Sequence, residues 1–123
     1  MSDIYQAIIL DHYRNPRCHG SLESPTHQAN ALNASCGDKL KMDIMVKNDM
    51  IEAVRFSGVG CAISQASASI LTEYVTGMSV AKAFGLEPND ILSLLGVTLS
   101  PSRIKCGLLS LETLQKTLRS PLT

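Results

Sequence analysis

The alternating stretch at residues 39–47 constrains the fold most strongly. Its even-numbered side chains are apolar and most of its odd-numbered ones are charged. A period of two predicts a strand with one buried face. Asn48 and Asp49 then predict a turn, and residues 50–57 pair back as the second arm of a hairpin. A further strand at residues 28–34 completes a small three-stranded antiparallel sheet.

Helical patterns lie on both sides of this sheet. Before it, a helix from Ser2 to Tyr13 ends at Asn15-Pro16, and a turn-rich crossing loop follows. After Gly60 the period changes, and four more helical segments are predicted: 62–75, 78–84, 88–95 and a long one starting at Ser100-Pro101. The order helix, meander sheet, helices predicts an α+β fold with about four to six helices packed on the sheet.

Composition limits the classes of function. The 123 residues, 45% of them apolar, predict a single domain over residues 1–123. Eleven basic side chains balance eleven acidic ones, so neither nucleic acid nor a membrane surface is an expected partner. No secretory signal and no apolar run of roughly 18 residues is present, which favours a cytoplasmic protein. In that compartment the four cysteines are expected to bind metal or react rather than to form disulfides.

Three cysteines lie in segments that favour thiolate chemistry. Cys36 precedes Gly37-Asp38, Cys61 follows a glycine pair at the start of a helix, and Cys106 is expected in the first turn of the last helix. Helix N-termini are electropositive and stabilise thiolates, and Arg103 and Lys105 act in the same direction as cations beside the ligands. The predicted ligand set is therefore Cys36, Asp38, Cys61 and Cys106.

The carboxylate distinguishes this set from a permanent cluster site. Three thiolates with one oxygen donor suit a tetrahedral zinc ion, and they also hold an iron–sulfur cluster. A hard oxygen donor on a soft centre makes one corner easy to exchange. We therefore expect Asp38 to favour a bound group that is handed onward.

Simpler interpretations remain open for single residues. Cys61 and Cys106 also fit small apolar core positions, Asp38 fits a turn, and Arg103 and Lys105 fit solvated charges. Cys18 with His19 is more typical of an incidental thiol than of a metal pair. His12 and His27 are more typical of surface or hydrogen-bonded histidines than of ligands.

Several motifs together resemble the U-type iron–sulfur cluster assembly proteins, the group of IscU, SufU and the NifU N-terminal domain. The matching stretches are DHYRNPR at 11–17 with Gly20, Cys36-Gly37-Asp38, FSGVGCAISQASAS at 56–69, and Arg103-Ile104-Lys105-Cys106. They span most of the chain, and the third is long and specific.

This resemblance implies a SufE/NifU-like fold and a scaffold role. Sulfur from a cysteine desulfurase and iron would combine into a transient [2Fe–2S] cluster for delivery to apo-proteins, with Zn²⁺ often in the same site when no cluster is present. Cys36, Cys61 and Cys106 would be ligands and sulfur acceptors, with Cys36 as the first candidate acceptor. Asp38 would be the fourth ligand. Whether one subunit or a homo-oligomer holds the cluster is left open.

Two branches of the family compete. Arg103 and Lys105 beside Cys106 look like the SufU branch, but the segment between Cys61 and Cys106 is too short for the insertion of that branch. Residues 99–103 read LSPSR, which departs from the Leu-Pro-Pro-Val-Lys chaperone motif of the IscU branch. Cys18 replaces an asparagine that is usual in the family.

Three functions follow from these residues. A non-enzymatic scaffold is the expected one. The alternative is a zinc-dependent sulfurtransferase that takes persulfide sulfur from a SufS-type desulfurase. The third is a purely structural zinc module, in which the metal contributes folding energy alone.

Overall fold

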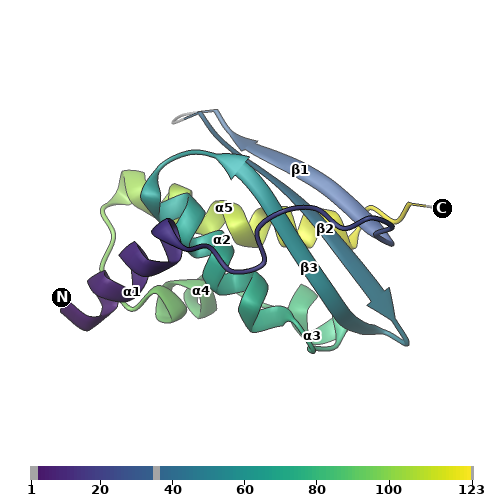
Figure 1. Ribbon diagram of the computed structural model, residues 1–123. Coiled ribbons are helices and arrows are strands. Elements are labelled where there is room, and N and C mark those ends of the chain that lie inside the picture. Colours follow the sequence, from purple (N-terminus) through teal and green to yellow (C-terminus); the bar gives the residue numbers. More distant parts are fainter. Residues whose placement is uncertain (1–2, 35–36, 123) are drawn as a thin grey trace.

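The computed structural model describes residues 3–34 and 37–122, which form three strands and five helices (Figure 1). The strands β1 (His27–Asn33), β2 (Asp38–Lys47) and β3 (Met50–Val59) make one antiparallel sheet in the order β1-β2-β3. The predicted meander and the α+β class are confirmed. The strand β3 continues beyond the predicted end at residue 57, because Val59 still pairs with Lys39 of β2.

The turn between β2 and β3 is where it was predicted. Asn48 and Asp49 have φ values of 54° and 61°, the left-handed region that a tight hairpin turn requires. Asparagine and aspartate tolerate this region better than most residues. The local chemistry of the turn therefore sets the hairpin register.

The two faces of the sheet have different partners. Leu40, Met42 and Ile44 of β2 are buried beneath the helices α2 (Ala62–Val75) and α5 (Pro101–Leu118), which lie along one face (Figure 1). Asp43 points to the other face, where its carboxylate accepts hydrogen bonds from the Leu22 N–H at 3.0 Å and the Gln28 amide at 2.8 Å. These bonds fasten the loop after α1 across the sheet.

Most helix boundaries match the prediction. The helix α1 spans Asp3–Arg14, and α4 spans Pro88–Leu95 as expected. The helix α3 (Val80–Phe84) starts later than the predicted residue 78, because the Ser79 side chain caps it by accepting a hydrogen bond from the Lys82 N–H.

The helices α2 and α5 pack closely through small residues. The Ser67 hydroxyl donates to the Gly107 carbonyl at 2.6 Å and lies 2.8 Å from the Ser110 hydroxyl. Both hydroxyls are buried and hydrogen-bonded, so they do not carry the cost of unpaired polar groups. This contact fixes the middle parts of the two helices relative to each other.

The helix α1 is attached to α2 by a buried polar contact. His12 Nδ1 lies 2.7 Å from the Ser69 hydroxyl, which also accepts a hydrogen bond from the Arg17 N–H at 2.8 Å. At its other end, Tyr5 packs against Gly96, where any side chain would collide with the ring.

No helix within residues 3–34 and 37–122 is long and apolar enough to cross a membrane.

Candidate metal centre

Asp38, Cys61 and Cys106 meet in the folded chain although they are distant in the sequence. One carboxylate oxygen and the two sulfur atoms all lie within 4.8 Å of one another. Ligand atoms around one tetrahedral zinc ion are about 3.5 Å apart, so small side-chain rotations would close this group on an ion. In the described part of the chain, no other group of three or more His, Cys, Asp or Glu side chains meets this criterion.

The carboxylate of Asp38 is held by the backbone of the next ligand. Asp38 is 1% exposed, and its Oδ1 accepts a hydrogen bond from the Cys61 N–H at 2.9 Å. Its Oδ2 lies 3.7 Å from the Cys61 sulfur, which donates the thiol proton to it. A metal ion bound here would take the place of that proton, because thiolates are the metal-binding form of cysteine. The donor set therefore fits a zinc ion or an iron–sulfur cluster.

Cys61 occupies the N-cap position of α2. No side chain of the described residues caps this end of the helix, so the free N–H groups and the helix dipole act on the site. Cys61 is half-buried, which leaves its sulfur reachable from solvent. The N-terminus of α2 therefore places partial positive charge beside Cys61.

Cys106 lies deeper than predicted. It is the sixth residue of α5, in the second turn rather than the first, because the helix begins at Pro101. Its side chain is 2% exposed, and its sulfur lies 3.9 Å from the Ser102 carbonyl oxygen. Cys106 therefore forms the floor of the centre, and Cys61 faces its opening.

Gly60 permits the close approach of these groups. A side chain there would collide with the Asp38 carboxylate and would lie 2.7 Å from the Ser64 hydroxyl. From the sequence alone, Gly60 fits an ordinary turn glycine, and its role at the site was missed. The available signal was its position directly before a cysteine ligand.

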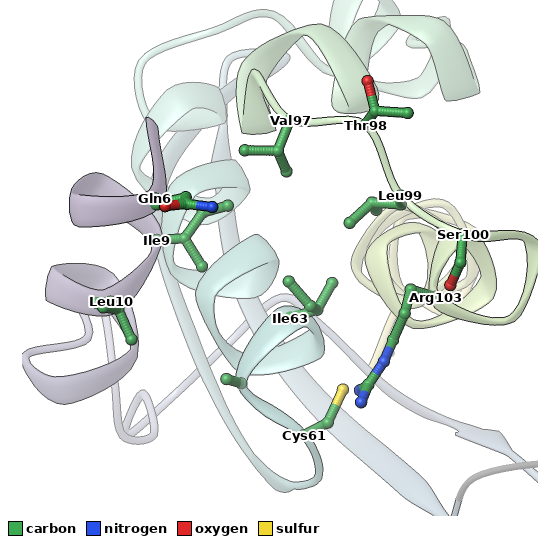
Figure 2. A pocket seen from close by; sticks show the side chains of 11 residues that line it. Gln6, Ile9, Leu10, Cys61, Ile63, Val97, Thr98, Leu99, Ser100 and Arg103 are labelled. Carbon is green, nitrogen blue, oxygen red and sulfur yellow. The ribbon is translucent and has the colours of Figure 1, made fainter. Parts of the chain in front are cut away.

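The two predicted cations lie in different places. Arg103 lines a cavity of about 440 Å³ that also contains the three donors. Figure 2 shows its guanidinium directed toward the Cys61 sulfur. Lys105 instead lines a separate groove with Asn33 and Glu112. Its role as a cation beside the ligands stays a prediction.

Other predicted residues are outside this group. Cys36 lies outside the described residues, so its role as ligand and acceptor stays a prediction. Cys18 does not join the donor group, and neighbouring His19 packs edge-on against Phe56 at 5.5 Å between ring centres. His12 is hydrogen-bonded to Ser69 rather than directed at the donors.

Comparisons with known proteins give one family over most of the chain. The family model described as "NifU-like N terminal domain" matches residues 4–120. The zinc-dependent sulfurtransferase SufU of Bacillus subtilis (strain 168) is 34% identical, over 94% of this chain and 90% of that protein. The iron–sulfur cluster assembly scaffold protein IscU of Aquifex aeolicus (strain VF5) is 42% identical, over 93% of this chain and 73% of that protein.

Solved structures show the same fold. A putative iron–sulfur cluster assembly scaffold protein for the SUF system from Fervidobacterium islandicum AW-1 superposes with a TM-score of 0.78. It is 28% identical and covers 96% of each chain. A crystal structure titled only as a hypothetical protein gives a TM-score of 0.82 at 30% identity, covering 97% of this chain and 99% of that one.

Proposed function

Since the chain belongs to the NifU-like N-terminal domain family, we propose that residues 1–123 act as one iron–sulfur cluster assembly scaffold. It accepts sulfur from a cysteine desulfurase, builds a transient [2Fe–2S] cluster and transfers it to apo-proteins in the cytoplasm. The names of the IscU and SufU relatives support this function. The observation that carries it is the convergence of Asp38, Cys61 and Cys106 within 4.8 Å.

The mixed donor set supports assembly and release rather than permanent storage. Cys36, two positions before Asp38 in the sequence, is proposed as the third thiolate. Thiolates bind iron and zinc strongly, whereas the Asp38 oxygen is the donor that exchanges most readily. The Cys61 N–H bond to Asp38 keeps the carboxylate next to the site when it is not a ligand.

Sulfur enters the site by thiol chemistry. A site thiolate, with Cys36 as the first candidate, attacks the outer sulfur of the partner's persulfide. A new S–S bond forms, the partner's S–S bond breaks, and the electron pair leaves with the partner's cysteine as a thiolate. Arg103, which lines the cavity with the donors, stabilises the negative charge during this exchange.

A zinc-dependent sulfurtransferase is the second candidate function. The relative of that name in Bacillus subtilis and the position of Arg103 beside the donors favour it. In this case Cys36, Asp38, Cys61 and Cys106 would hold Zn²⁺. The zinc ion would supply charge that keeps the ligand sulfurs deprotonated. The site thiolates would then exchange sulfur with the partner's persulfide in the same way, without building a cluster.

Anaerobic reconstitution tests the scaffold function. The protein is incubated with ferrous iron, cysteine, a desulfurase and a thiol reductant, which supplies the electrons that convert persulfide sulfur to sulfide. Visible absorption follows cluster formation and transfer to an apo-ferredoxin. We expect a cluster that forms on the protein and then leaves it. Failure of the protein to take up iron under these conditions would contradict the scaffold function. Strong desulfurase activation by the zinc form, with no gain from iron, would favour the sulfurtransferase.

Variants of Asp38 separate these functions from a structural zinc module. Asp38→Ala removes the acceptor of the Cys61 N–H, so it is expected to lower stability in every case. Asp38→Asn keeps that acceptor and removes the charge. In the scaffold we expect Asp38→Asn to slow transfer and prolong the bound cluster, with an unchanged thermal midpoint of the metal-free protein. If Asp38→Asn changes the thermal midpoint but leaves cluster transfer unchanged, the structural zinc module is indicated.

A further inference from the structure

A second, largely apolar cavity opens beside the metal centre. It has a volume of about 590 Å³ and lies between α1, the start of α2 and the segment before α5 (Figure 2). Leu10, Ile63, Val97 and Leu99 form much of its apolar wall. The volume lies within the range of about 300–1,000 Å³ that is typical of ligand pockets.

The apolar cavity adjoins the metal centre. Cys61 and Arg103 line both this cavity and the adjoining one that holds the three donors. Figure 2 shows the sulfur and the guanidinium together at one end of the apolar wall. A group bound in the apolar cavity therefore has one end beside the half-buried thiol.

The charge of the lining selects the kind of occupant. Among the described residues that line the cavity, Arg103 is the one charged side chain, and none is acidic. The N-terminal ends of α2 and α5 face the same region, and neither is capped by a side chain of the described residues. Apolar walls with a positive end fit an apolar group attached to an anion. A persulfide supplies the anion, and a neighbouring apolar side chain of the same protein supplies the apolar group.

We propose that this cavity seats an apolar side chain that flanks the persulfide-bearing cysteine in a loop of the desulfurase. The side chain occupies the space lined by Leu10 and Ile63, and the persulfide lies against Cys61 and Arg103. This inference rests on the proposed function, because that function requires a protein donor of sulfur. It adds a contact that places the persulfide next to the donor group.

A pair of substitutions on one helix tests the contact. Leu10 lines the cavity and is 45% exposed, whereas Ile8 is 39% exposed and is not among the lining residues. Leu10→Asp puts a carboxylate where an apolar group and an anion should bind, and Ile8→Asp is the matched control. The assay measures alanine release by the desulfurase of the same organism as the concentration of the protein is varied.

The expected result is a change in KM and not in kcat. Loss of one buried apolar contact with an added like charge should raise the KM for Leu10→Asp at least about tenfold. The KM of Ile8→Asp should stay within about twofold of the wild type. Thermal melts should show that both variants fold. An unchanged KM for Leu10→Asp, or equal changes in both variants, would overturn the inference.

Photocrosslinking identifies the occupant directly. A benzoylphenylalanine in place of Leu10 should crosslink to the desulfurase peptide that carries the catalytic cysteine, as read by mass spectrometry. Crosslinks to a remote segment, or only between two copies of this chain, would overturn the inference. If the wild-type protein neither binds nor activates the desulfurase, the proposed function fails as well. Normal activation with an unaffected Leu10→Asp variant removes the inference alone.

Discussion

Gly60 lies between the Asp38 carboxylate and the first turn of α2. The space that a side chain would need is already filled by the Asp38 carboxylate and the Ser64 hydroxyl. Sequence reasoning identifies glycines before a cysteine, but it does not reveal which atoms will surround them. Next to Gly60, the backbone N–H of Cys61 donates a hydrogen bond to the Asp38 carboxylate.

Substitution of Gly60 is expected to impair metal binding. In Gly60→Ala, the new methyl group must displace Asp38, so zinc affinity should fall at least about tenfold, as for other changes that disturb ligand orientation. Competition with a chromophoric chelator measures the affinity. Gly85→Ala is the matched control, since its methyl group would meet the Ala81 carbonyl oxygen at an ordinary 3.4 Å. Equal affinities of the two variants would contradict this role.

Cys18 adopts a left-handed backbone conformation. Its φ is 57°, and its carbonyl accepts a hydrogen bond from the Phe56 N–H at 2.9 Å. Asparagine visits this left-handed region more readily than cysteine. An asparagine would therefore suit the backbone at position 18 better than the cysteine does.

Cys18→Asn should therefore stabilise the protein. Relief of left-handed strain predicts a gain of up to about 1 kcal/mol in the free energy of unfolding. Urea denaturation measures it, with Cys18→Ala as the control that removes the thiol but keeps the strain. Equal stabilities of the asparagine and alanine variants would show that conformation is not the reason.

At the scale of elements, His12 couples α1 to α2. The side chain is 8% exposed, and burial lowers its pKa below the ordinary value of 6.5. The charge of Arg17 acts in the same direction, whereas Glu73 and Asp11 oppose it. The unfolded chain therefore binds a proton at a pH where the folded chain does not. The contribution of His12 to the free energy of unfolding is therefore fully present above about pH 6.5 and is lost as the pH falls below that value.

This coupling predicts a measurable pH dependence. The urea midpoint should fall between about pH 7.5 and about pH 5.5, and His12→Gln should show a smaller fall. Some dependence should remain, because burial also lowers the pKa of His27. A slope that is the same in His12→Gln and the wild type would exclude His12 as its source.

Element boundaries were predictable where local chemistry sets them. The alternation of β2, the turn at Asn48 and Asp49, and the proline at the start of α5 all agree with the structure. The late start of α3 and the extension of β3 were not predicted. The start of α3 follows from the local Ser79 cap, a signal that the sequence contained, whereas the extension of β3 depends on the pairing of Val59 with Lys39 of another strand.

At the scale of the whole molecule, the donor group joins three separate elements. Asp38 begins β2, Cys61 is at the N-cap position of α2, and Cys106 lies in α5. An ion bound by all three stabilises the folded state, because the unfolded chain offers no such preformed site. Metal binding and stability should therefore be linked.

Zinc removal should lower the melting temperature. At a free zinc concentration of about 100 times the Kd, the linked stabilisation is about 2.7 kcal/mol, which corresponds to roughly 10 °C for a chain of this size. Differential scanning calorimetry with zinc or with a chelator measures the shift. Cys106→Ser should abolish most of the shift. A melting temperature independent of zinc would contradict binding at this site.

The sequence by itself determined the elements and the donor types. Periodicity and turn residues indicate strands and helices because those signals act over a few neighbouring residues. The motifs at Asp38, Cys61 and Cys106 were equally visible, and the family resemblance they support is confirmed. The role of Cys36 stays a prediction, because that residue lies outside the described part of the chain.

The tertiary structure decided how these parts meet. Only packing of α2 and α5 on the sheet brings the three donors within 4.8 Å and places Arg103 in the same cavity. The same packing creates the apolar cavity next to Cys61. Such contacts join residues that are distant in the chain, so no local pattern encodes them. They arise from the shapes of buried side chains filling one core.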